Sequence, residues 1–303
     1  MGTEPTGRAA SLRGERRGTG SRRRAPRRAP GTLRMRATMR ALDEIAHVGA
    51  RIGIQVSDVD SGHTLLAADA HVALPVSEVG VLPLLVEVAC QIRDGVLDPA
   101  APVEPSDESE FGLWSHLQVD ELPLGDVAAL AASTGDPLAS NALLDLVGHE
   151  NVTRRMVSLG MTRSALLDRF RDTRGPDDAP HAAIGTASEY ARLLQRVLRR
   201  DGVDEETAGI VTSLLTLRRD VSLVAAPMAL DPGPAPSRDD DLLFVGATGR
   251  ADGVRADTGV VMGRSAALSY ALFVEFDDTS LLMRHHVHRA FHTLGEDLLE
   301  IVA

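Results

Sequence analysis

The spacing of apolar positions predicts a sheet built from both ends of the chain, with helices between its parts. Near the N-terminal end, a helix over 40–49 precedes two strand segments, 52–56 and 63–67, joined by a turn rich in Asp and Gly. The middle of the chain carries the helical period at 78–94, 125–132, 137–147, 150–158, 186–201 and 204–218. Apolar runs then predict strands at 241–246, 254–262 and 267–275, and a last helix at 281–302.

This order of elements predicts an α/β fold of the α+β kind. An antiparallel sheet made from both termini is flanked by helices and carries an inserted all-helical lobe. The sheet part covers about residues 40–72 and 205–303, and the helical lobe covers about 73–204. Binding sites in folds of this kind usually lie in the cleft between the two parts.

An Arg-rich tail, residues 1–39, differs in charge from the rest of the chain. Residues 1–40 carry 12 arginines and two acidic residues, a net charge of +10, whereas 41–303 carry 20 arginines and 41 acidic residues, a net charge of −21. The composition of the tail predicts disorder, and the alternative that translation begins at Met35 or Met39 stays open. The acidic body argues against nucleic-acid binding by the folded part, so nucleic acid is expected only through the tail.

Lysine is absent from the 303 residues, and all 32 basic side chains are arginine. A guanidinium keeps its proton at physiological pH, so it cannot replace a neutral lysine as a general base. Phosphate-binding-loop chemistry, Schiff bases and Ser-Lys dyads are therefore excluded. Cys90 is the only cysteine, and no apolar run reaches the ~20 residues that span a bilayer. We expect a cytoplasmic protein without an internal disulfide or membrane contact.

Four local segments resemble the serine β-lactamase and penicillin-binding-protein superfamily, in particular its class A-like branch. They are Val79-Gly80 leading into Leu82–Ala89, Gly135-Asp136-Pro137 leading into Leu138–Leu144, Leu167–Arg171, and Ala247-Thr248-Gly249. Their order and spacing agree with that family over about residues 40–303. The resemblance implies a β-lactamase-like fold whose site carries the motifs S-x-x-K, S-D-N and K-T-G and an omega-loop glutamate.

The first motif supplies the nucleophile and a lysine in the family that the chain resembles. In the register that keeps Val79 and Gly80 aligned, Glu78 takes the place of the nucleophile and Val81 that of the lysine. A register shifted by one residue makes Ser77 the nucleophile but puts Gly80 in the place of the lysine. A carboxylate is a poor acyl acceptor, and neither valine nor glycine transfers protons, so neither register gives S-x-x-K.

The second motif and the omega loop also differ from the family pattern. The resemblance assigns Asp136 to the aspartate of S-D-N, flanked by a glycine and a proline. Arg171 takes the place of the omega-loop glutamate and cannot activate water. Glu189 or Asp172 replaces that glutamate only if the backbone follows a path that the sequence does not foresee.

The third motif keeps its last two residues. Ala247 replaces the lysine, while Thr248 and Gly249 remain. The strand edge that pairs with a substrate amide is therefore retained without its cation. Arg255 or Arg250 is the candidate for a carboxylate-binding charge beside it.

Several candidate residues have a purely structural interpretation. Ser77 is expected to cap the helix that follows, since a serine oxygen accepts hydrogen bonds from the first helical amides. The arginines near the third motif are expected to pair with neighbouring acidic residues; they are Arg250, Arg255 and Arg264, opposite Asp252 and Asp257.

Neither a metal nor a cofactor is expected. His285, His288 and His292 share one stripe of the last helix, but they flank its core face on the solvent side. The acidic runs at 107–110 and 239–241 lack the ligand spacing of a calcium loop and are interpreted as solvated loops.

Three functional interpretations follow. We favour a non-catalytic β-lactamase-like protein, a pseudoenzyme whose cleft binds an as yet unidentified small molecule or a partner. The alternative is an active serine hydrolase that uses Ser77 with an unconventional base. A third interpretation makes the basic tail the functional part, which tethers an inert domain to nucleic acid.

Overall fold

The computed structural model describes residues 35–106, 111–230 and 242–303 of the chain. The predicted disorder of the tail concerns mostly residues 1–34, which lie outside the described residues, as do the acidic runs at 107–110 and 239–241. In the described part, no helix is both long and apolar enough to cross a membrane.

A five-stranded antiparallel sheet joins the two ends of the chain, in the order β2-β1-β10-β9-β8. The strands are β1 (Arg51–Asp58), β2 (Thr64–Ala68), β8 (Leu243–Ala251), β9 (Val254–Met262) and β10 (Ala267–Glu275). Strand β10 is buried on both faces. Its even positions, such as Tyr270 and Leu272, face one apolar core, while Ala271 and Phe273 face the other, because side chains alternate across a sheet.

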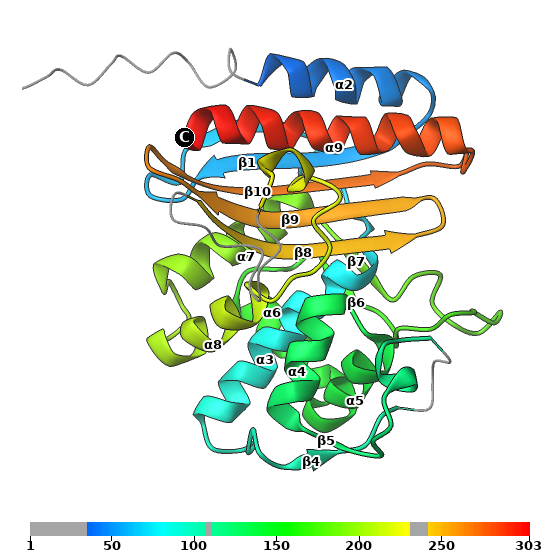
Figure 1. The fold of residues 1–303 in the computed structure, drawn as a ribbon, viewed down its shortest axis with the longest axis vertical. Coiled ribbons are helices and arrows are strands. Elements are labelled where there is room, and N and C mark those ends of the chain that lie inside the picture. Colours follow the sequence, from blue (N-terminus) through cyan, green and yellow to red (C-terminus); the bar gives the residue numbers. More distant parts are fainter. Residues whose placement is uncertain (1–34, 107–110, 231–241) are drawn as a thin grey trace, which may run out of the picture.

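Two helices cover one face of this sheet, α2 (Arg36–His47) and α9 (Leu281–Val302), and they contact each other (Figure 1). Helix α2 begins four residues before the predicted start at residue 40, within the segment that the sequence pattern assigns to the tail. Its first turn is held by Met35, which is fully buried, and by Thr38. The backbone N–H and the hydroxyl of Thr38 donate to Asp297 Oδ2 of α9, at 3.0 and 2.7 Å.

The other face of the sheet carries α7 (Ala187–Arg199) and the helical lobe (Figure 1). The lobe is built from α3 (Val81–Arg93), α4 (Leu124–Thr134), α5 (Pro137–Val147), α6 (His149–Ser158) and α8 (Glu205–Leu215). Helix α3 contacts all four of the others, which explains why it is apolar on every side. The predicted bounds of α5, α9, β9 and β10 agree with the structure, and the other helices differ by a few residues at their ends. Strand β8 extends to Ala251, beyond its predicted end at residue 246. Helix α8 belongs to the lobe although it lies past the lobe's predicted end at residue 204, because it packs on α3, whereas α7, inside the predicted lobe, packs on β10.

Short elements connect the lobe to the sheet. They are β3 (Leu74–Pro75), β4 (Pro102–Val103), β5 (Leu122–Pro123), β6 (Ala165–Leu166), β7 (Ala183–Gly185), and the 3-10 turns η1 (Ser77–Gly80), η2 (Trp114–His116) and η3 (Ala226–Met228). The turn η1 precedes α3, so the regular helix begins at Val81 rather than at the predicted residue 78. Because η1 contacts β8, it lies where the lobe meets the edge of the sheet.

Candidate functional site

The turn η1 lies unusually close to strand β8, and Gly249 makes this approach possible. A Cβ atom at Gly249 would lie 2.2 Å from the carbonyl oxygen of Val76 and 3.1 Å from the backbone nitrogens of Glu78 and Val79. No side chain fits in that space. The glycine of the Ala247-Thr248-Gly249 segment therefore brings the start of α3 against the strand edge.

Ser77 adopts a backbone conformation that is rare for a residue with a side chain. Its φ is +49°, in the left-handed region. The hydroxyl donates to the carbonyl oxygen of Arg250 at 3.1 Å, and no side-chain capping bond is made at the start of η1 or α3. The predicted capping role is thus wrong, because the left-handed turn directs the hydroxyl toward β8 instead of the helix amides.

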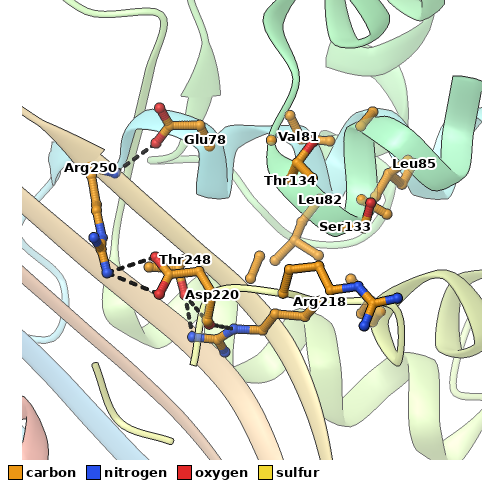
Figure 2. A pocket seen from close by; sticks show the side chains of 16 residues that line it. Glu78, Val81, Leu82, Leu85, Ser133, Thr134, Arg218, Asp220, Thr248 and Arg250 are labelled. Carbon is orange, nitrogen blue, oxygen red and sulfur yellow. Dashed lines mark hydrogen bonds and ion pairs between the residues drawn. The ribbon is translucent and has the colours of Figure 1, made fainter. Parts of the chain in front are cut away.

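Glu78 is half-buried beside the same strand. Its Oε2 accepts a hydrogen bond from the backbone N–H of Arg250 at 2.6 Å (Figure 2). Burial raises the pKa of the Glu78 carboxyl above its usual value; the backbone N–H groups of Arg250 and Glu78, the Ser77 hydroxyl and the Arg250 charge only partly oppose this. The carboxyl group therefore lies in a site that favours its protonated form more than water does.

Gly135, which precedes Asp136, contacts the Glu78 side chain. Its φ is +66°, and a Cβ atom added there would lie 2.8 Å from Glu78 Cγ and 2.9 Å from Glu78 Cβ. A glycine at 135 and a longer side chain at 78 are therefore sterically matched, since a residue with a side chain at 135 would collide with Glu78.

Asp136 is buried and acts as a structural cap. Its Oδ1 accepts from the backbone N–H of Ala139 in the first turn of α5, and its Oδ2 accepts from the backbone N–H of Trp114, both at 3.0 Å. Pro137 occupies the first helical position, where a missing N–H is tolerated. These bonds engage both carboxylate oxygens of Asp136.

Arg171 and Glu189, two of the omega-loop candidates, make different structural contacts. The Arg171 guanidinium lies 3.6 Å from Asp168 and 3.8 Å from Asp178, among the carboxylates of its own loop. Glu189 is buried at the start of α7, where it accepts from the Ser164 hydroxyl at 2.6 Å and from the backbone N–H of Thr162 at 2.9 Å. Glu189 is therefore held by the loop before α7 and does not substitute for the family's omega-loop glutamate.

Arg218, which the sequence reasoning did not single out, forms the most deeply buried ion pair described near the third motif. Its guanidinium contacts Asp257 on β9 at 2.6 Å, donates to the hydroxyl of Thr248, and lies 4.9 Å from the centre of the Phe244 ring. Burial lowers the pKa of Arg218, but the charge of and hydrogen bonds to Asp257 and Tyr270 together raise it above its usual value. Tyr270 donates to Asp257 at 2.7 Å.

The predicted partners of the surface arginines need correction. Asp257 pairs with Arg218 and not with the arginines near the third motif, while Arg250 pairs with Asp220 at 2.8 Å. Arg255 donates through Nε to His288 Nε2 at 3.2 Å and through Nη1 to backbone carbonyls.

That contact fits a neutral imidazole. Burial and the charges of Arg255 and Arg250 lower the pKa of His288 to about 4. The ring is therefore neutral at pH 7, and its Nε2 accepts the hydrogen bond from Arg255. The predicted stripe of three histidines is present on α9, and no group of three or more metal-ligating side chains occurs among the residues that the structure describes.

Two cavities adjoin η1, and Glu78 lines both. The Val81 cavity, of about 390 Å³, is lined by Glu78, Val81, Leu82, Leu85, 131–135, Leu215, 218–220, Ala247, Thr248 and Arg250 (Figure 2). The Arg171 cavity, of about 340 Å³, is lined by Pro75, Ser77, Glu78, Gly135, Pro137, 170–172, Arg174, 180–182, Ala251, Asp252 and Val254. Neither lining includes Asp136 or Arg255, so these two candidates lie behind or beside the cleft.

The Val81 cavity contains the position that the resemblance assigns to a lysine. Val81 is buried there next to Leu82, and the lining of this part is apolar. A register in which Gly80 takes the lysine's place leaves less room, because a Cβ atom at Gly80 would lie 2.3 Å from Ala183 Cβ. The geometry therefore supports the register with Glu78 and Val81.

The beta-lactamase enzyme family model matches residues 35–302. A β-lactamase from Sphaerobacter thermophilus DSM 20745 is similar at a TM-score of 0.77 and 21% identity, over 89% of this chain and 97% of that one. PBP-A is similar at a TM-score of 0.71 and 14% identity, over 87% of this chain and 96% of that one. A β-lactamase from Xanthomonas campestris pv. campestris str. ATCC 33913 is similar at a TM-score of 0.71 and 18% identity, over 88% of this chain and 97% of that one. No curated protein sequence matches. These chains share the fold, and by its match over 35–302 this chain belongs to the beta-lactamase enzyme family.

Proposed function

We propose that this chain is a non-catalytic member of the beta-lactamase enzyme family whose cleft binds a small molecule or a partner. The observation that carries the proposal is the environment of Glu78 and Val81. A carboxyl group stands beside β8 at the place that the resemblance assigns to the nucleophile, and a buried valine stands at the place that it assigns to the lysine. Serine acylation needs a hydroxyl nucleophile and a proton acceptor in the lysine's place; Glu78 carries no hydroxyl group, and Val81 accepts no proton.

The absence of lysine from the whole sequence supports the same conclusion and does not depend on any alignment. Two of the other candidate bases are engaged in structural contacts. Asp136 caps α5, and Glu189 accepts from the loop at 162–164. Arg171 carries a permanent positive charge in place of a carboxylate.

A second candidate function, a serine hydrolase that uses Ser77, is favoured by one observation. Ser77 has a left-handed backbone conformation, and its hydroxyl interacts with the neighbouring Glu78 carboxyl. Strained residues concentrate at active sites. Against this candidate, the hydroxyl donates to the carbonyl oxygen of Arg250, which cannot accept a proton for catalysis.

Hydrolysis assays on the purified chain distinguish the two functions. The substrates are a chromogenic cephalosporin and a nitrophenyl ester, tested on the wild type, Ser77→Ala and Glu78→Gln. The proposal expects the same background rate from all three proteins. Turnover by the wild type that Ser77→Ala abolishes would establish the hydrolase, and loss in Glu78→Gln as well would identify its base.

A further inference from the structure

The Val81 cavity combines an apolar floor with the carboxyl group of Glu78 at the end nearest η1. Leu82 and Leu85 of α3, together with Ala131 and Leu215, form the floor. In Figure 2, Glu78 and Arg250 lie on one side of the cavity, and Leu85 and Ser133 lie on the other. With a volume of about 390 Å³, the cavity falls in the usual range for small-molecule sites.

The floor determines what kind of group enters it. Its side chains are hydrocarbon and offer no hydrogen bond, and burying a polar group without a hydrogen-bond partner is unfavourable. The inner part of a ligand is therefore apolar. Val81 lines the same cavity and maintains its apolar character, since a charged side chain at position 81 would add a polar group beside the floor.

Two of the cations at the mouth already have acidic partners. Arg218 pairs with Asp257, and Arg250 pairs with Asp220 and contacts the Ser222 hydroxyl. An anionic ligand would have to compete with these carboxylates, and it would also meet the negative charge of Glu78. At these two arginines a carboxylate head group is therefore disfavoured.

Glu78 instead favours a donor head group. Its pKa is raised by burial, and a positive charge close to a carboxylate lowers its pKa again. A carboxylate accepts up to about four hydrogen bonds, and the Arg250 N–H supplies one from the protein side. A protonated amine at the mouth would add a charge-assisted hydrogen bond, which is stronger than a neutral one.

We propose that the Val81 cavity binds a small amphiphilic amine, with its hydrocarbon part against Leu82 and Leu85 and its protonated nitrogen at Glu78. This inference rests on the proposed non-catalytic function, because a cleft that acylates Ser77 would serve a reactive substrate. The binding step involves no covalent change.

Calorimetry with three probes that share one apolar body tests the proposal. They are 4-phenylbutylamine, 4-phenylbutanol and 4-phenylbutyrate, each titrated into the full chain at pH 7.5. The amine is expected to bind about tenfold more tightly than the alcohol, which corresponds to one charge-assisted hydrogen bond. The carboxylate is expected to bind more weakly than the alcohol.

Three variants locate the site. Glu78→Gln should remove the preference for the amine over the alcohol while both still bind. Ala132→Phe, at a half-buried lining position, should weaken all three probes by filling the cavity. Asp252→Asn removes a neighbouring charge that lines only the Arg171 cavity and should leave the titrations unchanged. Unfolding temperatures of the variants confirm that each is folded.

Several results would overturn the proposal. They are equal affinities for the three probes, tightest binding of the carboxylate, no binding of the amine, or an amine preference that survives Glu78→Gln. A mass spectrum of the same preparation after treatment with a penicillin tests the proposed non-catalytic function independently of amine binding. An adduct at Ser77 refutes the non-catalytic function, whereas the titrations judge the amine site alone.

Discussion

Glu78 is a residue whose proton affinity differs between the solvent and the folded chain. Its pKa is raised by burial, so the folded state holds this proton to a higher pH than the unfolded state does. Stability is therefore lost as the pH rises from the unfolded pKa of about 4.3 through the folded pKa, and the loss persists at neutral pH.

Glu78→Gln should remove that loss while its amide oxygen still accepts from the Arg250 N–H. We expect the variant to be more stable than the wild type at pH 7.5 by on the order of 1 kcal/mol, with the difference vanishing below pH 4. Urea unfolding at several pH values measures it, and Glu296→Gln, at an exposed position of α9, is the matched control. A variant that is less stable at pH 7.5 would contradict the assigned direction.

The buried pair of Arg218 and Asp257 makes the second prediction at the residue scale. Arg218→Met leaves a fully buried carboxylate without its cation, and we expect the free energy of unfolding to fall by about 3–5 kcal/mol. Arg250→Met breaks a partly exposed pair with Asp220 and should lower it by less than ~1 kcal/mol. Similar losses in the two variants would show that burial does not govern these pairs.

This pair also shows where sequence reasoning stops. Arg218 and Asp257 lie 39 positions apart, on the segment after α8 and on β9, and no local pattern marks them as partners. The sequence instead suggested pairing between arginines and acidic residues that are near neighbours along the chain, and tertiary packing overrode that choice.

At the scale of elements, η1 meets the segment before α5 where Glu78 contacts Gly135. The resemblance would place a serine at position 135, yet Gly135 has a φ of +66° and touches Glu78. Gly135→Ser should therefore lower the free energy of unfolding by about 1–3 kcal/mol. Part of that loss should disappear in the Glu78→Ala background, where the colliding atoms are absent.

A double-mutant cycle measures this coupling, which we expect at about 0.5–2 kcal/mol. Additive effects of Gly135→Ser and Glu78→Ala would show that strain in the backbone of residue 135, rather than the collision with Glu78, accounts for the loss.

Element boundaries were predictable where the local signals are strong. Asp136 and Pro137 mark the start of α5, and the apolar period of α9 runs without a break. The left-handed turn at Ser77 and the 3-10 turn before α3 were not predictable, because they depend on the close approach of Gly249, which follows Ser77 by 172 positions in the sequence.

For the whole molecule, the sheet joins the two ends of the chain, so its stability depends on contacts between α2 and α9. Removing residues 1–34 should leave the unfolding temperature unchanged, since Met35 begins the buried contacts of α2. Removing residues 1–39 should lower the free energy of unfolding by about 2–4 kcal/mol, because Met35 is lost and Asp297 loses both hydrogen bonds from Thr38. Equal stability of the two truncated chains, measured by thermal unfolding, would contradict this anchoring role.

The sequence anticipated the family, the antiparallel sheet and most helices, because these depend on periodicity and on short motifs. It did not anticipate the two cavities that share Glu78, since their linings combine α3, α4, α8 and β8, or η1, the omega loop and β8. Side chains from such distant segments meet only in the folded chain.

The central claim is that Ser77 is not a working nucleophile. Intact mass after incubation with a reactive penicillin and, separately, with a fluorophosphonate tests it most directly, with Ser77→Ala in parallel. We expect the unmodified mass from both proteins with both probes. A stoichiometric adduct on the wild type that Ser77→Ala does not form would contradict the claim and establish a serine hydrolase.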